Sequence, residues 1–336
     1  MIVAVLGAGS WGTALAAMAA DAGHDTRLWG RDAARMRELA RTRCNVHYLP
    51  ERTLPPEVLV TEDLERAVAG AELVVIALPA ASVREVALRL SAIGRQASPT
   101  PWRPILVCAS KGLEETSHMT MDKVLADAFA GARVVLFSGP TFAVEIARGL
   151  PAAAVVASTD AAAAETVQRA FASELFRVYT TEDVTGVAVG GALKNVIAIA
   201  AGCADGFGFG SNARAALITR GLNEMGRLAV RLGGNPLTLA GLAGLGDLVL
   251  TCTGELSRNR KVGLGLAAGK PLAEITAGLG HVAEGVFTAR IAAELAEELG
   301  VDMPIISQVA AVLAGRTTAR EAVADLLARE SRPERG

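Results

Sequence analysis

MIVAVLGAGSWG, residues 1–12, joins a short apolar run to a glycine-rich turn at the start of the chain. The apolar run predicts a buried strand, and the alanine-rich segment after the turn predicts a helix. Gly7 permits the tight turn, Gly9 lets the backbone approach a pyrophosphate, and Gly12 lets the helix pack closely on the strand. Free N–H groups at the helix start favour an anion. The stretch therefore predicts a dinucleotide-binding site.

Strands and helices alternate from this point to about residue 180. Further strands are expected at residues 26–29, 73–78, 105–109, 134–137, 153–157 and 175–179. This alternation is typical of parallel βαβ units, so we expect an α/β domain with a Rossmann-like doubly wound sheet in residues 1–180. Beyond it the apolar pattern predicts helices alone, at residues 183–204, 213–232, 237–250, 260–268, 284–299, 305–313 and 318–329. We therefore expect an all-helical substrate-binding domain in residues 181–336.

The bulk composition excludes several classes of function. Hydrophobic residues make up 51% of the 336 residues, which suits two well-folded domains. The net charge of −2 provides no field that would attract nucleic acid or a membrane surface. Residues 186–204 are apolar enough to raise the question of a membrane span, but Lys194 and Asn195 in the middle would be costly in lipid. We expect a buried helix there, and no membrane insertion.

Cysteine and histidine spacing gives no metal site. The four cysteines and four histidines are scattered, without the spacing of zinc ligands or of a disulfide framework. The N-terminus lacks the basic region of a signal peptide, so we expect a cytoplasmic protein with reduced thiols. The large apolar helical domain could contain a homodimer interface.

Cofactor choice is expected at the end of the second strand, in Gly30-Arg31-Asp32. An acid at the strand end would bind the ribose hydroxyl of NAD, whereas a nearby arginine suits the 2′-phosphate of NADP. Gly30 removes bulk and charge at this point, and Arg31 could pair with the phosphate. This favours NADP over NAD. In the alternative, Arg31 is merely solvated and Asp32 caps the next helix.

Two ionisable residues in apolar segments of the second half are the best candidates for catalysis. Reduction of a ketone needs an acid that protonates the developing alkoxide. Burial of Lys194 would lower its pKa toward neutral pH. Asp247 is an isolated acid that needs a partner, and Lys194 would provide one. The alternatives are a lysine that reaches the surface and an aspartate that caps a helix.

Other polar groups could bind the substrate. The basic cluster Ser257-Arg258-Asn259-Arg260-Lys261 begins a predicted helix and could hold a phosphate, although an ordinary solvated loop is the alternative. Lys111 and Gly139-Pro140-Thr141 follow two strands at the carboxyl edge of the sheet, where ligands bind in such folds. Glu284 stands at a predicted helix start, where it could contact the cofactor.

Taken together, these segments resemble the bacterial-type NAD(P)-dependent glycerol-3-phosphate dehydrogenase family. The resemblance runs in order through GAGSWG at 7–12, ASKGLE at 109–114, SGPTFAVEIARG at 138–149, VGGALKNVIAIAAG at 189–202, AGLGDLVLTC at 243–252, SRNRKVG at 257–263 and HVAEGV at 281–286. It implies reduction of dihydroxyacetone phosphate to sn-glycerol 3-phosphate for phospholipid synthesis.

The resemblance also implies residue roles. Lys194 matches the proton donor and acceptor of the family, with Asp247 beside it. The matching substrate contacts are Lys111, Gly139, Thr141, Lys194, Asp247, Ser257, Arg258 and Asn259. The matching cofactor contacts, added to the glycines of the turn, are Ser10, Trp11, Arg31, Lys111, Ala143, Arg258, Val282 and Glu284.

Two other functions remain open on the residues alone. A β-hydroxyacid dehydrogenase or ketopantoate-type reductase would share the Rossmann domain, the helical domain and the catalytic lysine, and its carboxylate substrate would also need a basic clamp. A non-catalytic NADPH sensor would keep the glycine turn but would not need Lys194, Asp247 and the basic cluster together.

Overall fold

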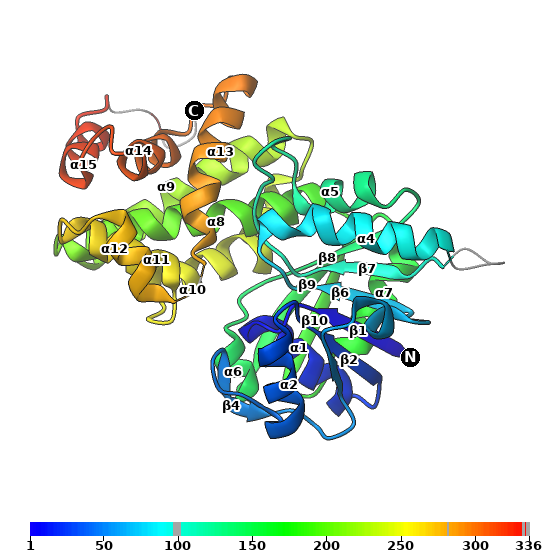
Figure 1. Ribbon diagram of the computed structural model, residues 1–336. Helices are drawn as coiled ribbons and strands as arrows, with labels where there is room; N and C mark the ends of the chain where they lie inside the picture. The colour runs from blue at the N-terminus through cyan, green and yellow to red at the C-terminus, as the bar shows by residue number, and fades with distance from the viewer. Residues whose placement is uncertain (97–101, 281, 331–332, 334–336) are drawn as a thin grey trace.

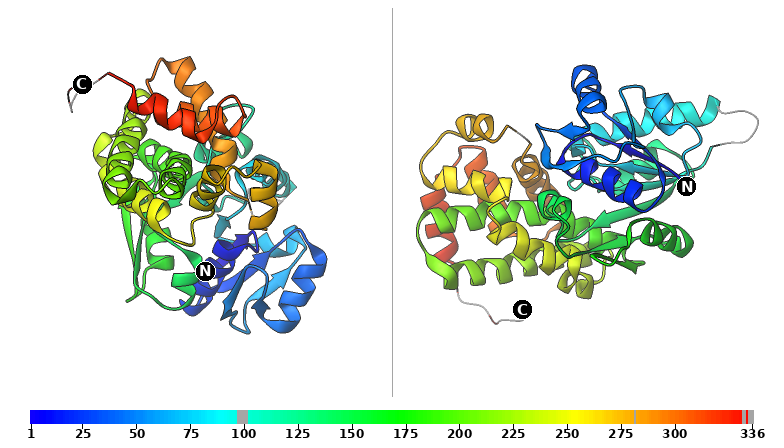
Figure 2. Two further views of the ribbon diagram at one scale, coloured as in Figure 1. Left: turned by 90° about the vertical axis from the view of Figure 1, so that its left-hand side faces the viewer. Right: turned by 90° about the horizontal axis from the view of Figure 1, so that it is seen from below.

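The chain folds into a sheet-containing body followed by a helical body. The computed structural model describes residues 1–96, 102–280, 282–330 and 333. Strands alternate with helices up to Thr181, and from Val184 onward the described residues form helices and turns without strands. Figure 1 shows the two bodies side by side, and Figure 2 shows the N-terminus in the first body. The expected fold class is therefore confirmed.

The main sheet has eight strands in the order β10-β9-β8-β7-β6-β1-β2-β5. Their bounds are β1 Ile2–Leu6, β2 Asp25–Trp29, β5 Leu59–Thr61, β6 Leu73–Ile76, β7 Ile105–Cys108, β8 Arg133–Ser138, β9 Ala152–Ala157 and β10 Phe176–Thr181. All neighbours are parallel except β8 and β9, which pair antiparallel. The expectation of purely parallel βαβ units is thus wrong at this point, because the short α6 between β8 and β9 is part of a reversing connection and not of a crossover.

Helices cover both faces of the sheet. Val3 and Val5 of β1 belong to one apolar cluster, whereas Ala4 and Leu6 belong to another, as the alternation of side chains along a strand requires. The first cluster is completed by α1 (Ser10–Asp21), α2 (Ala33–Thr42) and α7 (Ala161–Phe171). The second is completed by α3 (Leu64–Val68), α4 (Val83–Gln96) and α5 (Met121–Ala128). This arrangement is the doubly wound sheet.

The helical body is built around α8 (Val184–Gly206). Its other elements are α9 Gly210–Arg231, η2 Pro236–Ala240, η3 Leu242–Gly246, α10 Asp247–Thr253, α11 Arg258–Ala267, α12 Leu272–Leu279, α13 Glu284–Leu299, α14 Pro304–Leu313 and α15 Ala319–Leu327. Among the described residues, α8 alone is long and apolar enough to cross a membrane, and 83% of its most apolar window is buried inside the protein. It is therefore the core helix that residues 186–204 led us to expect.

Several elements differ from the sequence-based expectation. The predicted helix at 237–250 is three short pieces, η2, η3 and the start of α10, because glycines interrupt it. The pattern missed β5, α3, α6 (Ala143–Ala147), α12 and a two-stranded hairpin of β3 (Cys44–Asn45) and β4 (Leu49–Thr53). These pieces are too short to give a periodic signal.

Candidate active site

Three charged side chains from three distant segments meet between the two bodies. Lys194 lies in the middle of α8, Asp247 is the first residue of α10, and Lys111 follows β7. The Nζ atom of Lys194 donates to Oδ1 of Asp247, and Nζ of Lys111 donates to Oδ2 at 2.7 Å. Asp247 is 1% exposed and Lys194 is 7% exposed. One buried carboxylate thus holds two ammonium groups.

Burial and mutual attraction set the protonation of this cluster. Burial, with a smaller contribution from neighbouring Lys111, lowers the pKa of Lys194 from 10.5 to about 8, although Asp247 acts in the opposite direction. Burial alone would raise the pKa of Asp247, but the positive charges of Lys111 and Lys194 outweigh it and hold that pKa below its usual value. The result is a stable anion beside a lysine that can exchange its proton near neutral pH.

Small residues allow the segments to meet. A Cβ atom at Gly190 would lie 2.5 Å from the carbonyl oxygen of Ala243, so only glycine lets the turn before α10 approach α8 this closely. A Cβ atom at Gly191 would lie 3.3 Å from Oγ of Ser138 and 3.5 Å from the Lys111 side chain. The double glycine before Lys194 is therefore what lets α8 contact both the turn and the sheet edge.

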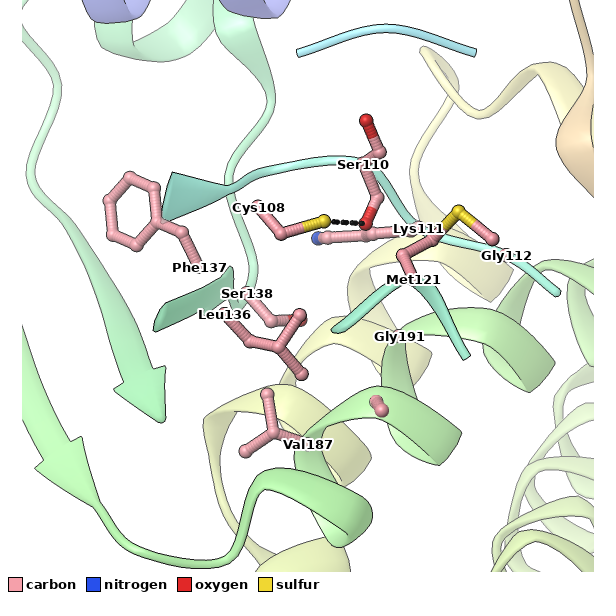
Figure 3. Close-up of a pocket in the computed structure, with 11 residues that line it drawn as sticks. Cys108, Ser110, Lys111, Gly112, Met121, Leu136, Phe137, Ser138, Val187 and Gly191 are labelled. Atoms are coloured by element: carbon pink, nitrogen blue, oxygen red, sulfur yellow. Dashed lines mark hydrogen bonds between the residues drawn. The ribbon is translucent and has the colours of Figure 1, made fainter. Parts of the chain in front are cut away.

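A small cavity lies beside Lys111 at the end of the sheet. Figure 3 shows Ser110 and Lys111 on the segment after β7; the cavity is lined by these residues and, among others, by Leu136, Ser138 and Gly191. The cavity has a volume of about 20 Å³ for the centres of water molecules, which leaves room for one or two of them. Lys111 is held here by a second hydrogen bond, from its Nζ to the carbonyl oxygen of Gly139 at 3.2 Å.

The predicted basic cluster divides into residues with different surroundings. Arg260 is tied to Asp205 by an ion pair of 2.7 Å, and Lys261 is exposed. Ser257 is buried and caps α11 by accepting from the backbone N–H of Arg260 at 3.2 Å. The exposed side chain of Arg258 begins α11. Arg258 is therefore the arginine of this cluster best able to hold an incoming anion.

The amide of Asn259 has a defined orientation. Its Oδ1 accepts from the backbone N–H of Gly285 at 3.0 Å, and its Nδ2 donates to Oδ1 of Asn195 at 2.8 Å. An amide nitrogen carries two protons, so one remains for a substrate oxygen. Asn195, next to Lys194 on α8, thus orients a residue of the basic cluster.

Glu284 joins the two bodies. It begins α13, and its Oε1 accepts from the backbone N–H of Ala80 in the segment after β6, at 3.2 Å. Burial raises the pKa of Glu284, against smaller opposing contributions from Ala80 and Arg258. Val282, just before this helix, is 41% exposed.

The glycine turn has the geometry that a dinucleotide requires. Gly7 has φ +118°, and a Cβ atom at Gly12 would lie 1.8 Å from the Gly7 carbonyl oxygen. A Cβ atom at Gly9 would instead meet no atom within 4 Å. No side chain caps the start of α1, in contrast to α2, which Asp32 caps. The first N–H groups of α1 are therefore available to an anion. The turn thus suits a pyrophosphate.

Other predicted cofactor and substrate residues surround this region. Trp11 stacks on Phe137, with ring centroids 6.0 Å apart. Gly139 has φ +134°, and its carbonyl oxygen accepts from Thr141 at 3.2 Å; Ala143 begins α6. At the end of β2, Asp32 accepts from the backbone N–H of Arg35, so the helix-cap alternative for Asp32 is correct. Arg31 beside it is exposed and remains available to a phosphate.

Three polar residues in these regions were not predicted as part of the site from the sequence. Thr251, one turn after Asp247 on α10, donates to the Asp247 backbone carbonyl at 2.6 Å and lies 3.4 Å from its carboxylate. The i, i+4 spacing could have identified it. Asn195 and Asn45 act across long sequence distances, so no local pattern indicates them.

Family models match both bodies of the chain. The model described as the N-terminus of NAD-dependent glycerol-3-phosphate dehydrogenase matches residues 2–164, and the model of its C-terminus matches residues 183–324. A relative from Anaeromyxobacter sp. (strain K), named glycerol-3-phosphate dehydrogenase [NAD(P)+], is 50% identical over 99% of this chain and 100% of its own length. A relative of the same name from Cupriavidus necator is also 50% identical, over 99% and 100%.

The chain is also similar to solved structures. The glycerol-3-phosphate dehydrogenase of Coxiella burnetii is similar at a TM-score of 0.92 and 38% identity, over 97% of this chain and 98% of that one. A ketopantoate reductase from Ralstonia eutropha covers 96% of this chain and 100% of its own at a TM-score of 0.60, but at 16% identity this likeness concerns the fold alone.

Proposed function

The chain belongs to the NAD-dependent glycerol-3-phosphate dehydrogenase family, and on that premise we propose that Lys194 is the proton donor and acceptor of its reaction. The reaction interconverts dihydroxyacetone phosphate and sn-glycerol 3-phosphate with NAD(P) as redox partner. When bound, the reduced nicotinamide supplies a hydride to the carbonyl carbon. The Lys194 ammonium group gives its proton to the carbonyl oxygen as negative charge develops there.

Asp247 and Lys111 prepare Lys194 for this step. The carboxylate of Asp247 fixes the direction of the Lys194 ammonium group and keeps it charged despite burial. Lys111 shares the same carboxylate, which lowers the pKa of Lys194 and favours proton release. In the oxidation direction neutral Lys194 takes the proton back. Asp247 is, in this proposal, both an orienting group and a contact for a substrate hydroxyl.

The phosphate of the substrate is held, we propose, at the start of α11. Arg258 supplies a bidentate fork, Asn259 its remaining amide proton, and Ser257 a hydroxyl. Lys111, Gly139 and Thr141 at the sheet edge complete the substrate contacts. The phosphate would thus be anchored by the helical body while the carbonyl group faces Lys194.

The cofactor would lie along the edge of the sheet. The glycine turn, Ser10 and Trp11 receive the pyrophosphate, and Ala143, Val282, Glu284, Lys111 and Arg258 contact the remainder. Exposed Arg31 favours NADP over NAD, since Asp32 is already used as a helix cap. We propose further that the two domains divide at residues 180 and 181, and that the protein is a cytoplasmic homodimer whose product feeds phospholipid synthesis.

The observation that carries this proposal is the buried contact of Asp247 with both Lys194 and Lys111. The test is loss of reduced-nicotinamide absorbance when purified protein is mixed with NADPH and dihydroxyacetone phosphate. NADH run in parallel measures the cofactor preference, and a panel of ketoacids serves as the control. Turnover of a ketoacid without turnover of dihydroxyacetone phosphate would contradict the phosphate clamp.

A further inference from the structure

The β3–β4 hairpin lies outside the main sheet but contacts the glycine turn. It spans Cys44 to Thr53 and pairs only within itself. Arg52 of β4 forms an ion pair with Asp21 at the end of α1, and the backbone N–H of Leu54 donates to the Arg43 carbonyl oxygen at 2.8 Å. Arg43 in turn donates to the carbonyl oxygens of Pro55 and Val58. The Arg52–Asp21 ion pair thus joins the hairpin to α1, and the bonds of Leu54 and Arg43 close the base of the hairpin.

Asn45 of this hairpin is the residue that reaches the turn. Its Nδ2 atom donates to the carbonyl oxygen of Ala8 at 3.0 Å and to Oγ1 of Thr13 at 2.7 Å. Its Oδ1 atom accepts from the backbone N–H of Tyr48 at 3.3 Å. Asn45 is 8% exposed and Thr13 is fully buried. Both amide protons and the amide oxygen of Asn45 are thus used, which defines the orientation of its side chain.

The bond to Ala8 bears directly on the backbone of the turn. In a planar trans peptide, the carbonyl group and the following N–H point in opposite directions. The hydrogen bond from Asn45 to the Ala8 carbonyl oxygen therefore also sets the direction of the Gly9 N–H. Gly9 is the N-cap of α1; its carbonyl oxygen accepts from the backbone N–H of Thr13 at 2.9 Å, and no atom lies within 4 Å of the position that a Cβ atom would take. The bond from Asn45 therefore adds a restraint on the peptide group between Ala8 and Gly9, where glycine itself gives the backbone wide conformational freedom.

We propose that Asn45 is a positioning residue for the dinucleotide: it holds the turn between Gly7 and Gly12 in the conformation that binds the pyrophosphate. This inference deepens the proposed function and rests on it for the identity of the cofactor. Restraint of the turn before binding lowers the ordering cost that the cofactor would otherwise have to meet. Asn45 itself acts through Ala8 and Thr13 and needs no contact with the ligand.

The decisive substitution is Asn45→Asp. An aspartate has nearly the same shape, so packing is retained, but an ionised carboxylate cannot donate and faces the Ala8 carbonyl oxygen with a negative charge. We expect the Kd for NADP⁺ to rise by about tenfold or more, the cost of losing hydrogen bonds at a buried site. The kcat at saturating NADPH and dihydroxyacetone phosphate should stay within about threefold, because the Lys194 cluster is untouched.

Lowering the pH separates positioning from general damage. A protonated carboxyl group at position 45 can donate again, so NADP⁺ affinity of the Asn45→Asp variant should recover in part at acidic pH, relative to wild type at the same pH. The matched control is Asn212→Asp, which makes the same change at an exposed site on α9 and should leave the Kd unchanged. If the substitution merely damaged the fold, protonation of the new carboxyl group would not restore NADP⁺ affinity.

The outcomes are distinguishable from those of the proposed function. An unchanged Kd for NADP⁺ in the folded Asn45→Asp variant overturns the inference, whereas wild-type protein that binds NADP⁺ but does not turn over dihydroxyacetone phosphate overturns the proposed function instead. If Asn45→Asp does not fold, Asn45→Ala decides the matter, since it removes the same donors without adding charge. A Kd equal to that of the wild type then overturns the inference.

Discussion

The two halves of the site hold their ligands by opposite means. The sheet body presents backbone: three glycines, an uncapped start of α1, and open space at Gly9. The helical body presents charge: Lys194 and Asp247, both buried, with Lys111 reaching them from the sheet edge. Backbone N–H groups are always present and need only the right conformation, whereas a buried charge needs a partner of opposite sign.

This contrast predicts different sensitivities. The glycine turn should be intolerant of added atoms and indifferent to charge at a distance, because its function depends on close approach. The charged cluster should be intolerant of lost charge even where shape is conserved. Substitutions that change either the affinity for the cofactor or the rate of the chemical step, but not both, therefore test this contrast between the glycine turn and the charged cluster.

Lys194→Ala should have the largest effect. Loss of the general acid should lower kcat by about 10²–10⁴-fold, the usual contribution of such a group, while the Kd for NADPH stays nearly constant. Steady-state kinetics and fluorescence titration of NADPH measure the two quantities. Lys270→Ala removes an exposed lysine paired with Glu274 and serves as the control. Undiminished turnover in the Lys194 variant would reject the assigned role.

Asp247→Asn should affect both stability and the pH profile. It keeps the shape but leaves Lys194 and Lys111 without their anion, a loss that costs about 3–5 kcal/mol when one partner of a buried pair is removed. The pKa of Lys194 should fall further, so turnover at neutral pH should decline. Chemical denaturation and a kcat–pH profile measure these effects, with exposed Glu274→Gln as control. A kcat–pH profile equal to that of the wild type would show that Asp247 does not set the pKa of Lys194.

Gly12→Ala should destabilise the sheet body. The new methyl group would lie 1.8 Å from the Gly7 carbonyl oxygen, and such overpacking costs about 1–3 kcal/mol. Gly226→Ala is the matched control, since nothing lies within 4 Å of that position in α9, and it should raise stability by about 0.5–1 kcal/mol. Gly9→Ala should keep the stability but weaken NADPH binding. Equal melting temperatures for the Gly12→Ala and Gly226→Ala variants would contradict this account.

The pH dependence of the wild type should report Lys194. Its pKa is lowered to about 8, and reduction needs the protonated form. The rate of reduction should thus be constant below this value and fall by up to about tenfold per pH unit above it. Oxidation of glycerol 3-phosphate needs neutral Lys194, so its rate should rise by up to about tenfold per pH unit below this value and become constant above it. Rates at saturating substrates in both directions provide the measurement. If the rates of reduction and oxidation changed in the same direction with pH, Lys194 could not be the one group that controls both.

Arg31→Ala should have the smallest effect. Arg31 is exposed, so its loss should raise the KM for NADPH by about tenfold or less and leave the KM for NADH unchanged. Arg37→Ala, a change at an exposed arginine on α2, the helix that follows Arg31, is the control. Equal losses for both cofactors would show that Arg31 does not discriminate between them.

The site was predictable where a residue type is unusual in its local sequence. A lysine in the middle of an apolar helix and an aspartate among glycines and leucines both stand out, and the expected contact between Lys194 and Asp247 is present. Lys111 was found by its place after a strand, but its bond to the same carboxylate was not. The strand β9 was expected, but its antiparallel pairing with β8 was not, because periodicity does not report the direction of a strand. The hairpin of β3 and β4 was missed because strands of two and five residues carry little periodicity.

The sequence by itself determined the local features: the strand–turn–helix at residues 1–12, the alternation that makes a doubly wound sheet, and the change to helices after residue 180. Each depends on neighbours along the chain, through periodicity or through the conformational freedom of glycine. Only the tertiary structure decided that Asp247 serves two lysines, and that Asn45 reaches Ala8 across 37 residues. Hydrogen bonds and ion pairs depend on distance in space, which packing alone sets.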